Sequence, residues 1–120
     1  MSAAMQMLDN AAVAARNGRA QALGLNPRDY LGLGRFSLAA EKLGVKATEV
    51  SKGPLGSGCL LKLASGNNHY EVLVDGTGGI LLGRVEADGK RVRLCAAGTS
   101  SEAGWGKLVQ ALRTSEGRAA

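Results

Sequence analysis

The stretch of sequence that decides the fold covers residues 80–96 and reads ILLGRVEADGKRVRLCA. Apolar and polar residues alternate along residues 80–87 and again along 90–96, which is the period of a β-strand with one buried face. The dipeptide Asp88-Gly89 separates the two runs. Between alternating segments it favours a two-residue hairpin loop, in which both loop residues adopt positive φ. The stretch therefore predicts two antiparallel strands joined by a tight turn.

A two-residue loop also sets the register of the predicted hairpin. Ala87 would face Lys90, and the next pairs would be Glu86 with Arg91, Val85 with Val92, and Arg84 with Arg93. One face would then be apolar, with Leu81, Val85, Val92 and Leu94. The other would carry a cross-strand pair of Glu86 with Arg91 and a basic surface made of Arg84, Arg91 and Arg93. This surface is a candidate contact for phosphates or acidic groups, or else an ordinary solvated sheet face.

Two more strands are predicted before this hairpin. Residues 59–64 form a short apolar run, and residues 65–68 have the composition of a turn. Residues 69–74 then alternate, and the glycine-rich residues 75–79 turn the chain into the hairpin. Together the four segments predict a four-stranded antiparallel meander.

Helical patterns are expected on the N-terminal side of the meander. Apolar residues recur at helical spacing along residues 2–23. Asn26-Pro27 marks a second helix start, and Gly32 and Gly34 predict that this helix is short. A third helix is predicted over residues 37–43, with a glycine after it.

The chain is predicted to end in a further helix. Thr99 and Glu102 have the spacing of a capping box, and one apolar stripe follows, made of Trp105, Leu108, Val109 and Leu112. The predicted fold class is therefore α+β, with N-terminal helices, a four-stranded antiparallel meander and a C-terminal helix. We interpret residues 1–120 as a single domain with a helical part (2–44), the meander (45–96) and the C-terminal helix (99–114).

Residues 36–52 carry the most specific local pattern, FSLAAEKLGVKATEVSK. A small residue (Ala40), a glycine (Gly44) and an aliphatic residue (Val50) follow one another as in the helix-turn-helix of DNA-binding regulators, which this stretch resembles. The resemblance implies a recognition helix over about residues 47–52. Base edges and phosphates would then meet Lys46, Thr48, Glu49, Ser51 and Lys52.

The same residues 47–52 also fit a first strand, because Thr48 and Val50 favour strands and Pro54 would cut a recognition helix short. With a strand there, residues 37–82 resemble the helix-plus-meander PepSY domain, whose turn region is similar to residues 69–81. Both interpretations stay open from the sequence.

The composition favours some partners over others. The chain has 120 residues, 45% of them hydrophobic, and a formal net charge of +5. This charge favours a polyanionic partner such as nucleic acid or a nucleoprotein. No segment approaches the ~20 apolar residues that span a bilayer, and the N-terminus lacks the pattern of a signal peptide. We therefore expect a cytoplasmic location and no membrane contact.

No catalytic or metal-binding signature is found in the sequence. Cys59 and Cys95 form no Cys-x-x-Cys pair, and both fall in predicted strands, either as buried thiols or as a disulfide. His69 is the single histidine, and Ser65 and Glu71 are its nearest candidate partners for nucleophilic catalysis. We expect a loop-edge histidine without a catalytic role, and hence no enzyme, no metal and no cofactor.

The leading hypothesis is a non-enzymatic binding protein that contacts nucleic acid or a nucleoprotein, as a small regulator or a phage or mobile-element protein would. Residues 37–52 would grip the nucleic acid, and the three arginines of the hairpin would add charge. The alternative is a protein–protein interaction module, such as an inhibitor or a virion component, without nucleic-acid contact. It would use the helix over residues 2–23 or an exposed sheet edge. Self-association into a homo-oligomer also stays open.

Overall fold

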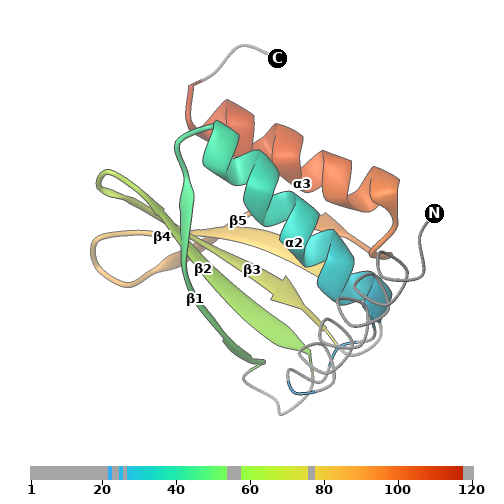
Figure 1. Cartoon of the computed structure of the whole chain (residues 1–120). Coiled ribbons are helices and arrows are strands. Elements are labelled where there is room, and N and C mark those ends of the chain that lie inside the picture. The colour runs from blue at the N-terminus through green and yellow to red at the C-terminus, as the bar shows by residue number, and fades with distance from the viewer. Residues whose placement is uncertain (1–21, 23–24, 26, 54–57, 76–77, 118–120) are drawn as a thin grey trace, which may run out of the picture.

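Two helices lie side by side on one face of an antiparallel sheet in the computed structural model (Figure 1). The structure describes residues 22, 25, 27–53, 58–75 and 78–117. Its elements are α2 (Pro27–Lys42), β1 (Lys46–Lys52), β2 (Cys59–Ser65), β3 (Asn68–Val74), β4 (Ile80–Val85), β5 (Arg91–Ala97) and α3 (Glu102–Ser115). The predicted α+β class and the C-terminal helix are confirmed. The helix predicted over residues 2–23 lies almost wholly outside the described residues.

The sheet is a five-stranded meander in the order β1-β2-β3-β4-β5, not the predicted four-stranded one. The additional strand is β1, so the helix expected over residues 47–52 is wrong and the alternative, a first strand, is correct. A Schellman motif ends α2: Gly44 has a φ of 83°, and the Val45 amide donates to the Ala40 carbonyl at 2.9 Å. The motif turns the chain back toward the sheet, where β1 pairs with β2.

One continuous helix, α2, replaces the two short helices predicted between Pro27 and residue 43. Glycine in a helix interior costs about 1 kcal/mol, so Gly32 and Gly34 argued for an interruption. Burial of Leu33, Phe36 and Ala40 outweighs that cost, because a buried large apolar side chain contributes about 1.5–3 kcal/mol. Gly32 is also required by packing, since a Cβ there would overlap the Trp105 indole.

The core lies between the sheet and the two helices. Alternate residues of the three central strands point toward the helices and are at most 2% exposed, namely Cys59, Leu61, Leu63, Tyr70, Val72, Val74, Ile80 and Leu82. The helices contribute Phe36, Leu108 and Leu112, also fully buried. The ring centroids of Phe36 and Trp105 lie 5.9 Å apart, and the two ring planes form an angle of 42°. This distance is within the range of favourable aromatic pairs. The apolar stripe predicted on the C-terminal helix is therefore confirmed.

The hairpin between β4 and β5 has a three-residue loop, and the predicted two-residue loop is wrong. The Glu86 amide donates to the Lys90 carbonyl at 2.8 Å, and the Gly89 amide donates to the Glu86 carbonyl at 2.9 Å. Gly89 has a φ of 85°, whereas Asp88 does not adopt positive φ. A type I turn followed by a left-handed glycine has this geometry. The Asp88 carboxylate accepts a hydrogen bond from the Lys90 amide at 2.9 Å.

The longer loop moves the register by one residue beside the turn. Val85 faces Arg91, Arg84 faces Val92, and Gly83 faces Arg93. A shift of one residue exchanges the two faces of a strand, so the predicted apolar and charged faces of the hairpin are wrong. The register shifts back between Leu82 and Gly83.

The N-terminus of α3 is capped by Ser101, so the predicted capping box at Thr99 is wrong. The Ser101 hydroxyl accepts a hydrogen bond from the Gly104 amide at 3.1 Å. The Thr99 hydroxyl donates to the Ser101 hydroxyl at 3.2 Å. The helix therefore begins at Glu102, a residue that the sequence pattern had placed in its first turn.

Glu116 ties the C-terminal end of α3 to the turn between β2 and β3. Its carboxylate accepts hydrogen bonds from the Ser65 hydroxyl at 2.6 Å, from the Asn68 side-chain amide at 3.1 Å and from the Tyr70 hydroxyl. Burial of the Tyr70 ring raises the pKa of its hydroxyl above the ordinary value, and the hydrogen bond to Glu116 raises the pKa further. This cluster fixes α3 to the sheet at the end opposite Trp105.

Two alanine substitutions in α2 should have opposite effects. Gly34→Ala should raise the free energy of unfolding by about 0.5–1 kcal/mol, because a Cβ there would meet no atom within 4 Å. Gly32→Ala should lower it, since its Cβ would lie 2.8 Å from two carbons of the Trp105 indole. Chemical unfolding followed by circular dichroism measures both. Equal stabilisation by the two alanines would contradict the packing of Trp105 on Gly32.

Alkaline pH should destabilise the fold through Tyr70. The pKa of Tyr70 is raised in the folded state, so its contribution to stability is fully present below the unfolded pKa of about 10 and is lost as the pH rises through the folded pKa. In a Tyr30→Phe variant Tyr70 is the single tyrosine, and ultraviolet absorbance follows its ionisation. A Tyr70→Phe variant should lose less stability at alkaline pH. Ionisation of Tyr70 at the ordinary pKa in the folded protein would contradict this expectation.

Candidate binding face of the sheet

The sheet has one face toward the helices and one that no described helix covers, which we call the open face (Figure 1). A charged row crosses it, because directly paired residues of an antiparallel sheet share a face. The row contains one residue from each strand, in the order Glu49, Lys62, Glu71, Gly83 and Arg93. Glu49 and Lys62 form an ion pair at 3.6 Å. Both side chains are about half exposed, so the pair contributes little to stability.

Arg91 reaches across β4 to bind Glu71. Its Nε lies 2.8 Å from Glu71 Oε2, and its second guanidinium nitrogen lies 3.3 Å from Oε1. The strand between them contributes Gly83 opposite Glu71, so no side chain stands in the way. These hydrogen bonds raise the pKa of the Arg91 guanidinium above its ordinary value. The ion pair thus joins β3 and β5, two strands that are not neighbours in the sheet.

An apolar row lies beside the charged row. Leu60, Leu73 and Leu81 pair directly across β2, β3 and β4, and all three are half-buried. Together with Arg91 and Arg93 they line a groove of about 400 Å³. The open face thus combines an apolar floor with guanidinium groups along its β5 side.

Basic residues stand at both edges of the open face. Lys46 of β1 pairs with Ala64 of β2, which puts it on the open face near Lys62. Arg91 and Arg93 stand on β5, at the other edge of the sheet. Lys46 and Arg93 are exposed and form no ion pair with any described residue. Their charges are therefore available to a partner.

The structure brings together only part of the site predicted on residues 46–52. Lys46, Glu49 and Ser51 lie on the open face, opposite Ala64, Lys62 and Leu60 respectively. Lys52 pairs with the buried Cys59 and therefore lies on the helix side. Thr48 stands at a β-bulge and donates its hydroxyl to the Lys62 carbonyl at 3.3 Å.

The three arginines of the hairpin do not form one surface. Arg91 and Arg93 lie on the open face, but the shifted register puts Arg84 on the helix side. Arg84 binds Glu86, with a guanidinium nitrogen 2.9 Å from the carboxylate. The sequence predicted that Glu86 pairs with Arg91. In the structure Glu86 pairs with Arg84 instead.

The set of binding residues predicted from the sequence does not include Lys62 and Glu71. Lys62 stands between the buried Leu61 and Leu63, and this alternation alone was a usable signal that it faces away from the core. The ion pair of Glu71 with Arg91 left no such signal, because it depends on the register of two hairpins.

Ser65 and Glu71, the two candidate partners of His69 in catalysis, bind other side chains. The Ser65 hydroxyl donates to Glu116 at 2.6 Å, and Glu71 binds Arg91. His69 is exposed at the start of β3, where it pairs with Ala64 and Val85.

The two cysteines are free thiols, so the disulfide alternative is wrong. Cys59 lies on β2 and Cys95 on β5, with two strands between them. Burial raises the pKa of the Cys59 thiol, which lowers the fraction of reactive thiolate at neutral pH. Among the described residues, no three histidine, cysteine, aspartate or glutamate side chains are grouped as metal ligands would be.

Comparisons with known proteins do not assign the chain to a family. No protein-family model matches it, and no curated protein or solved structure is significantly similar to it. In the described part of the chain, no helix has the length and apolar character needed to cross a bilayer. The function is therefore inferred from the geometry of the chain itself.

Proposed function

We propose that the protein is a non-enzymatic binding module that contacts nucleic acid, free or within a nucleoprotein, through the open face of its sheet. One observation carries the proposal: four basic residues lie on this one face, and no described helix covers them. Lys46 and Lys62 come from β1 and β2 at one edge of the sheet, and Arg91 and Arg93 come from β5 at the other edge. The formal net charge of +5 adds long-range attraction to a polyanion.

The contacts would be made to the phosphate backbone. Single-stranded nucleic acid is commonly held by bases that stack on aromatic side chains. The four Phe, Trp and Tyr residues of the chain all lie elsewhere: Tyr30 and Phe36 on α2, Tyr70 in the core, and Trp105 on α3. Ammonium and guanidinium groups bind phosphates without reading the sequence. We therefore expect binding to duplex DNA with little sequence preference.

A second candidate function is docking of a protein partner on the apolar row. This candidate is favoured by the half-buried Leu60, Leu73 and Leu81, which no described residue covers from the open side. Salt separates the two candidates, because an apolar interface tolerates added salt and phosphate contacts do not.

Electrophoretic mobility shift of a random-sequence duplex tests the proposal. Four phosphate contacts would lower the affinity roughly a hundredfold between about 50 and 200 mM salt. A Lys46→Glu/Arg93→Glu variant should bind more weakly and lower the salt slope by about two. Both residues are exposed and unpaired among the described residues, so the fold should be retained.

The matched control is Lys42→Glu/Lys107→Glu, which makes the same change in net charge on exposed positions of α2 and α3. It should retain most of the wild-type affinity. Equal losses in both variants would mean that net charge alone drives binding. Absence of a shift by the wild type at low salt would exclude duplex binding and turn the search to a protein partner.

A further inference from the structure

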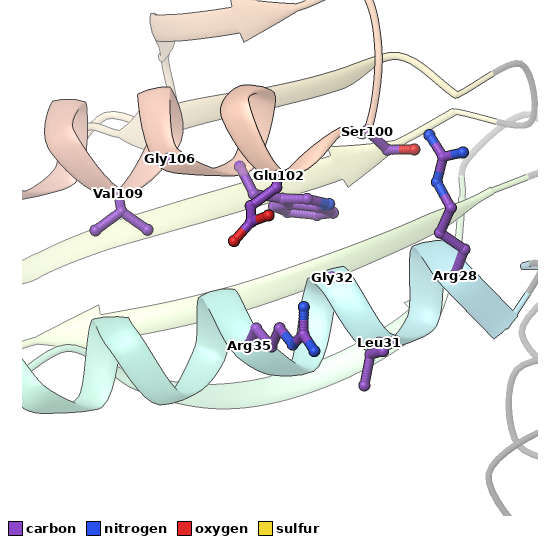
Figure 2. Close-up of a pocket in the computed structure, with 9 residues that line it drawn as sticks. Arg28, Leu31, Gly32, Arg35, Ser100, Glu102, Gly106 and Val109 are labelled. Carbon is purple, nitrogen blue, oxygen red and sulfur yellow. The ribbon is translucent and has the colours of Figure 1, made fainter. Parts of the chain in front are cut away.

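A pocket of about 370 Å³ lies between α2 and α3, on the side of the molecule away from the open face (Figure 2). Small-molecule sites in proteins have volumes of about 300–1,000 Å³, so this pocket can hold a small ligand. Figure 2 shows Arg28, Leu31 and Arg35 along one helix, and Glu102, Gly106 and Val109 along the other.

Two glycines create the pocket. Gly32 allows the Trp105 indole to pack against the backbone of α2, because any Cβ at this position would overlap the ring. Gly106 stands one residue after Trp105 and lines the pocket, and a Cβ there would meet no atom within 4 Å. The helices are therefore held close together at Gly32, while space remains in front of Gly106.

Trp105 contributes a polar group without a partner. Its side chain is buried, with 7% of the residue exposed, and it lines the pocket. The indole Nε1 is the single fully buried side-chain nitrogen or oxygen in the described part of the chain that makes no hydrogen bond. Buried indole N–H groups usually have an acceptor. The described part of the chain therefore leaves this N–H without an acceptor, and a small shift of the indole would be needed for a ligand to supply one.

The pocket has an excess of positive charge. Arg28 and Arg35 line it from α2, and Glu102 is the single acidic residue in its lining. Neither arginine forms an ion pair with a described residue. The nearby carboxylate of Asp29 is engaged, because it accepts a hydrogen bond from the buried Ser100 hydroxyl. Two unpaired guanidinium groups beside an apolar wall suit a ligand with one negative charge.

We propose that this pocket binds a small organic carboxylate with an apolar body. Arg28 and Arg35 attract the carboxylate to the pocket, and one of them pairs with it. The Trp105 indole N–H gains the ligand as an acceptor once the ring edge shifts toward the pocket, because Nε1 is fully buried before binding. The apolar body lies against Leu31, Trp105 and Val109, which supply the apolar part of the lining. The site is separate from the open face, so it stands or falls independently of nucleic-acid binding.

Trp105 reports directly on the pocket, because it is the single tryptophan of the chain. Hexanoate and benzoate are the probes, and hexanamide and benzamide are their neutral controls. Titration of the carboxylates should give a saturable change in tryptophan fluorescence and a shift of the single indole N–H resonance. The amides should bind about tenfold more weakly, because they lack the charge that pairs with the guanidinium groups.

Three variants test where the probes bind. Gly106→Leu should abolish the response while keeping the fold, because its side chain would enter the open space of the pocket. Arg28→Gln/Arg35→Gln should weaken carboxylate binding about tenfold and bring it close to amide binding. Lys107→Gln removes an exposed charge next to the pocket without touching its lining, and it should leave the response unchanged.

Three results would overturn the proposal. One is no saturable response to either carboxylate up to the solubility limit of the probe. Another is equal affinity for carboxylates and amides, and the third is undiminished binding by the arginine double variant. That variant changes two exposed side chains only, so it decides the question even if Gly106→Leu fails to fold.

Discussion

The packing of the Trp105 indole on the bare backbone of Gly32 is the contact on which the rest of the structure depends. It brings α2 and α3 close together at one end, and the ring of Phe36 packs beside the indole over the sheet. At the other end, Glu116 binds Ser65, Asn68 and Tyr70 and fixes α3 to the β2–β3 turn. The two helices are thus held as one layer over a single face of the sheet, and the open face is left to its own side chains.

An ion pair between strands that are not neighbours crosses that open face. Arg91 of β5 binds the Glu71 carboxylate of β3 over Gly83 of β4. This ion pair anchors one guanidinium group on the face, while Arg93 remains unpaired among the described residues. The proposed nucleic-acid contact and the proposed carboxylate pocket use different cations on opposite sides of the sheet. The open face owes its cations to the strand register, whereas the pocket owes its space to Gly106.

Much of the fold could be predicted from periodicity, but the site could not. The α+β class and the apolar stripe of α3 followed from alternation and helical spacing, because both depend on which face is buried. The predicted register of the hairpin was wrong. It depends on whether both Asp88 and Gly89 adopt positive φ, and only Gly89 does. Strand β1 was ambiguous because Gly44 suits both a tight helix–helix turn and a Schellman motif. Gly32 and Gly34 look alike in the sequence, and only the tertiary contact with Trp105 distinguishes them.

Nuclear magnetic resonance titration of the ¹⁵N-labelled protein with a random-sequence duplex at low salt tests the central claim most directly. Binding through the open face predicts that the largest amide shifts occur around Lys46, Lys62 and Arg93, and that α2 and α3 change little. Largest shifts on the two helices, with an unperturbed sheet, would contradict the proposal that the open face is the binding surface.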